Sequence, residues 1–500
     1  MKNLLFLPIL IPLATAVLGL LAWKRHRLQR WLGVCSAGAL LLTALMLLSQ
    51  VRQHGVLSVQ SGNWQAPFGI TLVADMFSAL MIVATGCIGL CVTIYSLADT
   101  DFRQESLGYH PLLQVLLLGI CGSFLTGDLF NLYVWFEVML IASFVLLAMG
   151  GKREQMEGAI KYVAINLIAS AFFLAGIGLL YGVAGTLNMA HLALVLREAP
   201  HTGTIPVIAA LLFIAFSIKA AVFPFQFWLP ASYHTTTVAV TTIFSALLSK
   251  VGIYVLIRVF TLIFYQETVA GQSLILAAAG LTMLVGALGA IAQPDLRRML
   301  CFCVVSQIGY LLMGLGMLTP LALVGSIIFM LHIMAAKSAL FLSGGIAARL
   351  VANSPADCSG ALYRQHPLLA ALFLVPALSV AGIPPLSGFW GKLVLVKAGL
   401  GAGHYLTVAA ALGVSVLTLY YLVRAWSDLF WKERQVADQP SPLPVPAVQD
   451  WWLWGPIAAL ALVSLLMGVA AQPFFRLAQI AADQLMEPSR YIEAVLGVIQ

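Results

Sequence analysis

Apolar stretches long enough to cross a lipid bilayer recur along almost the entire chain, and this pattern constrains the fold more than any other feature. Of the 500 residues, 61% are hydrophobic and only 9% are charged. A soluble domain carries charge on about a quarter of its residues. The hydrocarbon core offers no water to backbone groups, so each stretch must satisfy its own hydrogen bonds as a helix. The sequence therefore predicts an all-α polytopic membrane protein.

The hydropathy pattern predicts about fourteen transmembrane helices. Their approximate ranges are 3–23, 32–50, 71–95, 111–127, 128–149, 160–182, 205–227, 238–262, 273–292, 300–318, 321–348, 367–398, 404–426 and 451–472. Because basic residues follow the first apolar stretch instead of preceding it, we expect a retained anchor rather than a cleaved signal peptide. The Pro-rich polar segment 427–450 is predicted to be a cytoplasmic linker. After residue 473, the mixture of charged and apolar residues predicts a short amphipathic helix on the outer surface.

The distribution of Lys and Arg between alternate loops predicts the orientation. If the loop after the first helix is cytoplasmic, 14 basic residues lie on that side: Lys24, Arg25, Arg27, Arg30, Arg103, Lys152, Arg153, Arg297, Arg298, Arg349, Arg364, Arg424, Lys432 and Arg434. The opposite side has 5: Lys2, Arg52, Arg197, Arg476 and Arg490. This bias follows the positive-inside rule and predicts both termini on the outer side. The net charge of +7 thus reflects basic residues in the predicted cytoplasmic loops and indicates no nucleic-acid partner.

Two of the predicted helices are interrupted by residues that break helices. The interrupting residues are Pro224 and Pro230 in the seventh helix, and Gly382, Pro384, Pro385 and Gly388 in the twelfth. Each interruption lies close to a lysine inside the span, Lys219 or Lys392. Paired broken helices in two halves of a chain indicate internal repeats and a transport site. The alternative is two unrelated proline kinks, which membrane helices tolerate.

We therefore expect two inverted five-helix repeats, formed by helices 4–8 and helices 9–13. An odd number of helices in each repeat turns the second repeat over in the membrane. The predicted organisation is 1–110 for helices 1–3, 111–262 for the first repeat, 273–426 for the second repeat, 427–450 for the linker and 451–500 for helix 14 with an outer tail.

Glu137 and Lys219 are predicted to lie mid-helix, where an isolated charge is costly. The carboxylate needs a cation, and Lys219 is its natural partner. Buried lysine can gain and lose a proton, whereas arginine stays protonated. Separation of the pair would release the lysine proton, so the pair is a candidate gate. A static salt bridge between two helices is the alternative.

Further basic side chains extend this pair into a row. Lys250, His332, Lys337 and Lys392 lie within other predicted spans, with Ser and Thr residues between them. His332 and Lys337 are about 140° apart around an ideal helix, so they point to different neighbours. Such a row predicts a lateral path for protons. Snorkelling toward a membrane surface is the alternative for any single lysine, and it suits Lys161 and Lys397 best, which we leave out.

Other features of the sequence indicate no cofactor. Arg258 is interpreted as a structural counter-charge because it does not readily lose its proton. The seven cysteines form no CxxC pair and predict neither a disulfide framework nor a metal site. His332 has no second histidine suitably placed for haem, since His234 lies at a helix end. The sequence thus favours ion transport over redox chemistry within this chain.

Several segments together carry a resemblance to a known family. They are the helix around Glu137, IKAAVFPFQFWLPASY with Lys219, LLSKVGIYVLIR with Lys250, DLRRMLCFCVVSQIGY, and ALSVAGIPPLSGFWGKLVLVKAG with Lys392. Over nearly its full length the chain resembles the antiporter-like proton-translocating subunits shared by respiratory complex I, membrane-bound hydrogenases and Mrp-type (Mnh, Pha) Na⁺/H⁺ antiporters. Within this superfamily it is most similar to the D-type subunits of the Mrp antiporters.

The resemblance implies a proton-translocating subunit of a Na⁺/H⁺ antiporter, in a bacterial inner membrane and with obligatory partner subunits. It also implies that Glu137, Lys219, Lys250 and Lys392 form the pair, the relay and the exit, with His332 and Lys337 between Lys250 and Lys392. Because the spans hold more lysine than carboxylate, we expect Na⁺ to pass partly through a neighbouring subunit. The alternatives are a proton-pumping subunit of a complex I-like oxidoreductase or hydrogenase, and a scaffold that transports nothing.

Overall fold

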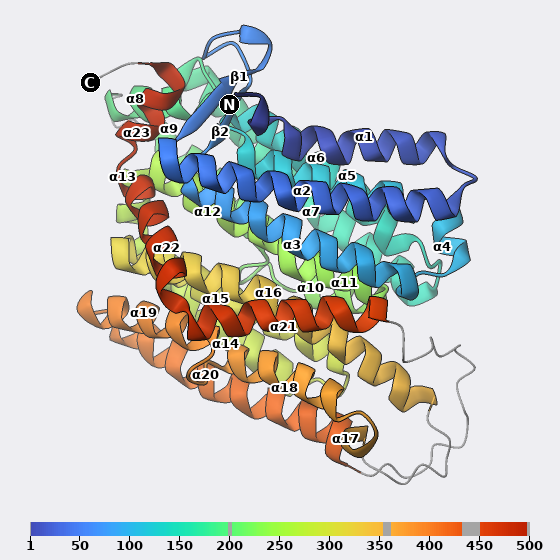
Figure 1. The fold of residues 1–500 in the computed structure, drawn as a ribbon. Coiled ribbons are helices and arrows are strands. Elements are labelled where there is room, and N and C mark those ends of the chain that lie inside the picture. Colours follow the sequence, from blue (N-terminus) through green and yellow to red (C-terminus); the bar gives the residue numbers. More distant parts are fainter. Residues whose placement is uncertain (1, 199–202, 354–361, 433–450, 498–500) are drawn as a thin grey trace.

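The computed structural model describes residues 2–198, 203–353, 362–432 and 451–497, and long helices form most of it (Figure 1). Ten helices in these ranges are long and apolar enough to cross a membrane, and the shorter apolar helices are Leu7–Leu21, Tyr109–Leu125, Thr204–Ala220 and Pro367–Ala381. These helices coincide with the predicted segments, and the chain is a multi-pass membrane protein. That all fourteen segments cross the bilayer, and that they form two inverted repeats, stay predictions.

The first helices are α1 (Leu7–Leu21), α2 (His26–His54) and α3 (Met76–Asp99). Between α2 and α3 the chain forms an antiparallel hairpin of β1 (Leu57–Gln60) and β2 (Thr71–Ala74), in which Leu57 lies opposite Ala74. The sequence-based expectation of a purely α-helical chain, with a helix from residue 71, missed this hairpin. The Asp75 side chain accepts the backbone N–H of Ser78 and so begins α3.

The middle of the chain includes the predicted first repeat, residues 111–262, with α4 before it and α13 after it. The helices of this part are α4 (Phe102–Ser106), α5 (Tyr109–Leu125), α6 (Leu129–Ala148), α7 (Arg153–Ala184), α8 (Met189–Glu198), α9 (Thr204–Ala220), α10 (Trp228–Ser232), α11 (Val238–Ile243), α12 (Ser249–Leu262) and α13 (Tyr265–Ala270). A π-helical segment, Phe244–Leu248, connects α11 to α12, so these three segments form one continuous span.

The second predicted repeat follows. Its helices are α14 (Gln272–Ile291), α15 (Leu296–Met317), α16 (Pro320–Asn353), α17 (Leu362–Gln365), α18 (Pro367–Ala381), α19 (Ser387–Gly401) and α20 (Tyr405–Trp426). A π-helical segment, Ser427–Trp431, extends α20 into the predicted linker. The first residues of the predicted linker are therefore helical, and residues 433–450 lie outside the described part of the chain.

Both predicted interruptions are present. Pro224 lies in the break between α9 and α10, and Gly382, Pro384 and Pro385 lie in the break between α18 and α19. Pro230 does not interrupt a helix, because it lies in the first turn of α10, where a missing N–H costs little.

The C-terminal helices are α21 (Trp451–Val469), α22 (Ala471–Met486) and α23 (Ser489–Leu496). The prediction of helix after residue 473 is confirmed, but α22 does not simply lie on a surface. It packs against α3, α12 and α16, and α23 contacts α8 and β1. Ala478 and Ala481 of α22 are fully buried in this contact. Their small side chains allow α22 to approach the other helices closely.

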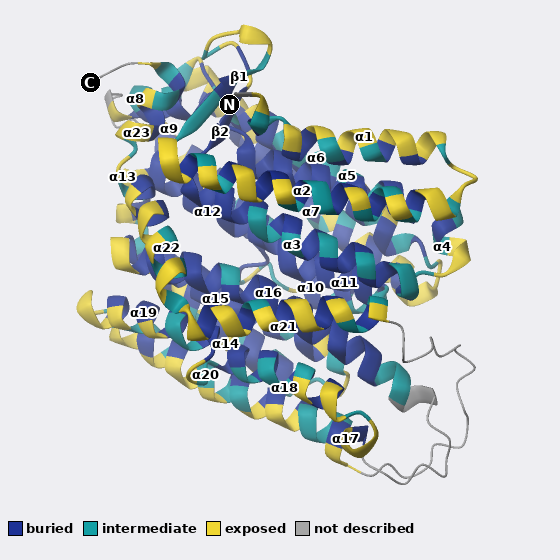
Figure 2. Cartoon of the chain, viewed as in Figure 1, coloured by how far each residue is buried: buried dark blue, intermediate teal, exposed yellow. Residues whose placement is uncertain are grey.

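The centre of the bundle consists of α12, α15 and α16, which are buried on nearly all sides (Figure 2). Outer helices such as α2, α7, α14 and α20 expose apolar faces, as expected for contact with lipid. α16 lies between the α1–α2 side and the α18–α20 side of the bundle (Figure 1) and contacts α15, α18, α19, α21 and α22. Polar side chains on α12 and α16 are therefore enclosed by protein rather than lipid.

Candidate functional site

Lys219 lies in the last turn of α9, directly before the first break. The expectation of a mid-helix position is therefore wrong, because the helix ends at Ala220. The next residue, Ala221, has a left-handed φ of 60° that turns the chain out of the helix. The break thus places the lysine amine next to irregular backbone in the interior of the bundle.

Side chains from other segments satisfy the backbone groups freed by this break. The backbone N–H of Phe223 donates to Thr282 Oγ1 of α14 at 3.0 Å. Trp228 Nε1 donates to the carbonyl oxygen of Ile218 at 3.0 Å. Irregular backbone at membrane depth is tolerated only where protein groups replace water in this way.

The structure links Glu137 of α6 to Lys219 through Ser170 of α7. Ser170 Oγ donates to Glu137 Oε1 at 2.5 Å, and Lys219 Nζ donates to Ser170 Oγ at 3.4 Å. The lysine Nζ also lies 5.6 Å from the centroid of the Phe136 ring. Glu137 and Lys219 therefore do not form the predicted direct ion pair. The Ser170 hydroxyl lies between them. Glu137 and Lys219 are both half-buried.

A small cavity of about 30 Å³ extends from Lys219 toward α12. Its lining includes Tyr162, Asn166, Leu248 and Gly252. A cavity of roughly 10–15 Å³ suffices for one water, so this space has room for water between Lys219 and the helix that carries Lys250.

Lys250 is fully buried and is the second residue of α12, just after the π-helical segment. Its Nζ donates to the carbonyl oxygen of Ser245, which belongs to that segment, and to Ser249 Oγ at 3.3 Å. Single π-helical turns often occur at functional sites because they reposition side chains and carbonyls. Hydropathy cannot reveal such a turn, and the sequence did not predict it.

His332 and Lys337 of α16 point to different neighbours, as their spacing predicted. His332 Nδ1 lies 2.7 Å from Ser387 Oγ in α19, and Lys337 Nζ donates to Cys303 Sγ in α15. Both side chains are fully buried. α16 therefore contacts α15 through Lys337 and the second broken helix through His332.

His332 faces a cluster of three serine hydroxyls at this second break. Ser387 Oγ lies 3.0 Å from both Ser379 Oγ and Ser464 Oγ, which come from α18 and α21. A β-carbon on Gly388 would collide with the carbonyl oxygen of Ser379 and lie 2.7 Å from His332 Nε2. Only glycine allows the break to close against the histidine.

Lys392 of α19 closes the row on the far side of the bundle. Its Nζ donates to the carbonyl oxygen of Ala381 at 3.0 Å and to Ser415 Oγ at 2.9 Å. It also lies 5.0 Å from the centroid of the Tyr310 ring. Gly382 has a φ of 93°, and a β-carbon there would lie 3.0 Å from Lys392 Cδ. The glycine break therefore makes room for the lysine stem.

The six predicted residues lie on five helices, α6, α9, α12, α16 and α19. In the described residues no two of the six are joined directly by a hydrogen bond or ion pair. Hydroxyl, carbonyl and thiol groups hold them instead: Ser170, Ser245, Ser249, Cys303, Ala381, Ser387 and Ser415. Sequence reasoning expected Ser and Thr in general but named none of these residues, and it assigned no role to Cys303.

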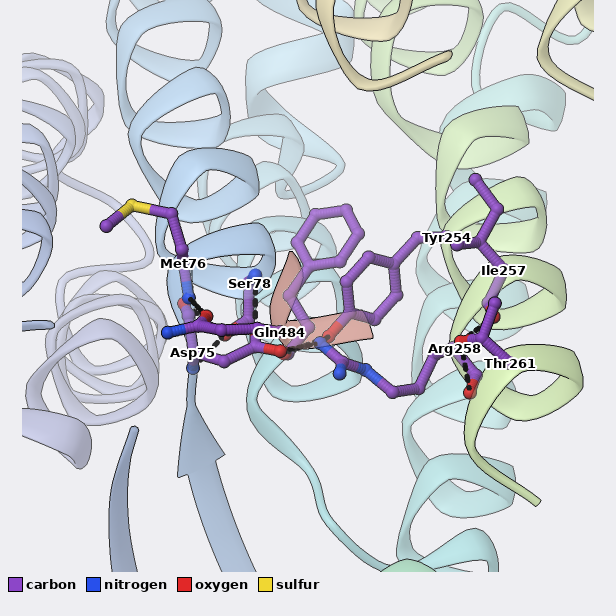
Figure 3. Close-up of polar contacts among 9 residues, drawn as sticks. Asp75, Met76, Ser78, Tyr254, Ile257, Arg258, Thr261 and Gln484 are labelled. Atoms are coloured by element: carbon purple, nitrogen blue, oxygen red, sulfur yellow. Dashed lines mark hydrogen bonds and ion pairs between the residues drawn. The ribbon is translucent and has the colours of Figure 1, made fainter. Parts of the chain in front are cut away.

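A separate buried ion pair lies outside this row. Arg258 Nη2 contacts Asp75 Oδ2 at 2.6 Å and donates to the Tyr254 hydroxyl at 3.4 Å (Figure 3). Gln484 of α22 accepts the backbone N–H of the first residue of α3 at 2.8 Å, and the Tyr491 ring lies 5.3 Å from the guanidinium. The interpretation of Arg258 as a counter-charge is confirmed. The pair joins the start of α3 to α12, and Gln484 and Tyr491 attach the C-terminal helices to it.

Comparison with known proteins gives consistent results. Residues 126–418 match the family model described as NADH:quinone oxidoreductase/Mrp antiporter, TM. The chain is 41% identical over 496 residues to the D-type subunit of the Na⁺/H⁺ antiporter of Alkalihalophilus pseudofirmus, covering 99% of this chain and 100% of that protein.

Solved structures agree with this result. A chain in the structure of the Mrp complex from Dietzia sp. DQ12-45-1b superposes with a TM-score of 0.90, at 32% identity and with 99% of this chain and 100% of that chain covered. A chain of the membrane-bound sulfane sulfur reductase, an archaeal respiratory membrane complex, gives a TM-score of 0.89 at 27% identity with the same coverage. The chain therefore belongs to the NADH:quinone oxidoreductase/Mrp antiporter transmembrane family, within the branch formed by the D-type subunits of Na⁺/H⁺ antiporters.

Proposed function

We propose that this chain is the proton-translocating subunit of a multisubunit antiporter that exchanges Na⁺ for H⁺ across a bacterial plasma membrane. One observation carries the proposal. Lys219, Lys250, Lys337 and Lys392 occupy the interior in a row, and in the described residues none of them is in direct contact with a carboxylate. Structural lysines are buried with a fixed anion, whereas a lysine held by neutral groups is suited to gain and lose a proton.

In the proposed route, protons reach Lys219 from one side of the membrane near the first break. Water in the adjoining cavity is proposed to carry protons from Lys219 toward α12, the helix of Lys250. The path continues through His332 and Lys337 of α16 to Lys392, and protons leave near the second break. Movement of Glu137 away from Ser170 and Lys219 removes the negative charge that holds the lysine proton, and this opening sends the proton onward.

Partner subunits follow from the exposure of the first pair. Glu137 and Lys219 are only partly buried by this chain, and contact of charged groups with lipid would be costly. A neighbouring membrane subunit is therefore proposed to cover them, as in the multisubunit complex to which the Dietzia chain belongs. Na⁺ is proposed to cross partly through such a neighbour, since the path here offers lysines rather than clustered carboxylates. In the proposed orientation, the basic loops face the cytoplasm and both termini lie outside.

The likeness to the sulfane sulfur reductase complex supports a second candidate, a proton-pumping subunit driven by a redox reaction. The two functions differ in their driving force. Everted vesicles that contain the intact complex would show Na⁺-dependent proton movement in the first case and movement driven only by a reductant in the second.

The variant Lys219→Ala tests the row itself, with Lys161→Ala as the control. Lys161 is half-exposed and pairs with Glu157 on the outside of α7. We expect loss of exchange in Lys219→Ala and parental exchange in Lys161→Ala at equal expression. Parental proton flux in Lys219→Ala would overturn the proposed route.

A further inference from the structure

A polar cavity of about 240 Å³ lies at the end of the bundle where α14, α15, α16 and α20 meet. Its lining includes Gln293, Asp295, Ala348, Tyr421, Arg424 and Asp428. Asp295 and Arg424 are exposed, whereas Tyr421 is 1% exposed and forms part of the inner wall. The cavity is large enough for several waters and has polar groups to hold them.

Tyr421 connects this cavity to the interior. Its hydroxyl donates to Cys303 Sγ at 2.8 Å, and the same oxygen lies 3.3 Å from Thr418 Oγ1. Cys303 Sγ also accepts a hydrogen bond from Lys337 Nζ. Cys303 and Lys337 are fully buried. One continuous chain of contacts therefore leads from the cavity, through a phenol and a thiol, to a lysine in the middle of the row.

Tyr421, Cys303 and Lys337 each have the chemistry to pass a proton. A phenol and a thiol can both donate and accept a hydrogen bond. In the described residues, Cys303 Sγ is the one hydrogen-bond acceptor for Lys337 Nζ. A static contact that only neutralised Lys337 would be better served by a carboxylate, because a thiol carries no fixed charge.

We propose that Tyr421 and Cys303 form a second aqueous access to the proton row, which joins it at Lys337 and is separate from the routes at the two broken helices. A proton from cavity water binds to the phenol oxygen as the phenol proton passes to sulfur, and the sulfur proton passes to the neutral amine of Lys337. Hydronium and a neutral amine thereby become water and an ammonium, and Tyr421 and Cys303 each keep one proton. The reverse sequence releases a proton into the cavity.

This access deepens the proposed proton translocation and rests on it. It gives the protein a connection to the end of the bundle that carries the loop before α15. If this loop is cytoplasmic, as its arginines predict, Lys337 exchanges protons with the cytoplasm without passing Lys219.

The experiment compares Na⁺-dependent proton movement in everted vesicles that contain the intact complex. Tyr421→Phe and Cys303→Ala each interrupt this chain of contacts, and we expect a fall of about 10²-fold in rate, the lower end of the contribution of positioned proton-transfer groups. The apparent KM for Na⁺ should stay at its parental value. Cys303→Ser restores a group that donates and accepts, so it should recover most of the rate. Ala348→Phe, which fills the cavity, should lower the rate as Tyr421→Phe does.

Matched controls come from the same helices. Tyr420→Phe changes a neighbouring tyrosine that is 55% exposed, and Cys301→Ala changes a buried cysteine two residues from Cys303. Both should exchange at the parental rate. A Cys303→Ser rate as low as that of Cys303→Ala would reduce the role of Cys303 to packing and overturn the proposal.

Two outcomes separate this inference from the function on which it rests. Parental rates in both Tyr421→Phe and Cys303→Ala, together with loss of exchange in Lys219→Ala, would overturn the second access and leave the antiport function standing. If the parent responds to a reductant instead of Na⁺, the same variants are compared under that driving force. Parental pumping in both would again overturn the access.

Discussion

Glu137 and Lys219 are joined through a serine hydroxyl rather than by direct contact. Ser170 Oγ lies 2.5 Å from Glu137 Oε1 and 3.4 Å from Lys219 Nζ. A hydroxyl between two charges weakens their attraction compared with direct contact, yet it keeps them aligned. Small movements of α6 relative to α7 and α9 can therefore change how strongly the carboxylate acts on the lysine, which suits a gate better than a rigid ion pair.

The first prediction concerns this serine. Ser170→Ala removes a hydrogen bond to a charged group, worth about 1.5–3 kcal/mol, so we expect exchange to slow by about tenfold or more. Ser170→Thr keeps the hydroxyl and should retain most of the activity. Proton movement in vesicles at equal expression measures both. Parental exchange in Ser170→Ala would show that the hydroxyl does not couple the pair.

The second prediction concerns the glycines at the second break. Gly388→Ala forces a β-carbon against the Ser379 carbonyl and His332, so we expect loss of exchange or of assembly. Gly382→Ala should have a weaker effect of the same sign, because the nearest atom is a carbon of the flexible Lys392 side chain. Gly413→Ala on α20 is the control, since no atom lies within 4 Å of its added carbon. Equal activity and equal amounts of complex in all three would contradict this explanation of the break.

The third prediction concerns stability. Asp75→Asn leaves the buried guanidinium of Arg258 without its anion, and breaking such a pair costs about 3–5 kcal/mol. We expect a lower Tm for the purified complex and easier proteolysis of the C-terminal helices, which the cluster holds to α3. The double variant Asp75→Asn with Arg258→Gln should lose less stability than Asp75→Asn alone. A double variant with a lower Tm than either single variant would show that the ion pair itself is not the cause.

The fourth prediction concerns pH and Glu105, which lies outside the candidate spans. Glu105 of α4 accepts hydrogen bonds from Arg30 at 2.6 Å and from His110 at 3.0 Å. Burial alone would raise the pKa of Glu105, but the hydrogen bonds and charges of His110 and Arg30 outweigh it and lower the pKa to about 2. Because the folded-state pKa is below the usual 4.5, the cluster stabilises the fold above pH 4.5. This stabilisation is lost as pH falls toward about 2.

Glu105→Gln tests this sign. The variant should have a lower Tm than the parent at neutral pH, and the difference should shrink as pH falls below 4.5. Thermal unfolding of the purified complex across this pH range measures the effect. A difference in Tm that stays constant with pH would show that ionisation of Glu105 does not contribute.

The long helices and the two breaks could be predicted from the sequence because they depend on local signals. Hydropathy identifies a span from its own residues, and Pro or Gly beside an intramembrane lysine identifies the break. The spacing of His332 and Lys337 likewise predicted different neighbours, and they face Ser387 and Cys303.

The features that the sequence did not predict depend on residues distant in the chain. Cys303 contacts Lys337 only because α15 packs against α16, and no property of an isolated cysteine reveals this contact. The hairpin of β1 and β2 is short, and the apolar residues of β2 lead almost directly into α3, so hydropathy assigned them to the following helix. α22 looked like a surface helix because its amphipathic pattern gives no partner, whereas its apolar face packs against the bundle.

The measurement that tests the central claim most directly is Na⁺-dependent proton movement in everted vesicles that contain the intact complex. It compares the parent with Glu137→Ala and Lys392→Ala, which alter opposite ends of the row, at equal expression. The proposed route predicts that exchange is lost in both variants, because the Glu137–Lys219 gate and the exit at Lys392 each control a step of the exchange. Exchange at the parental rate in either variant would contradict the role of that end of the row.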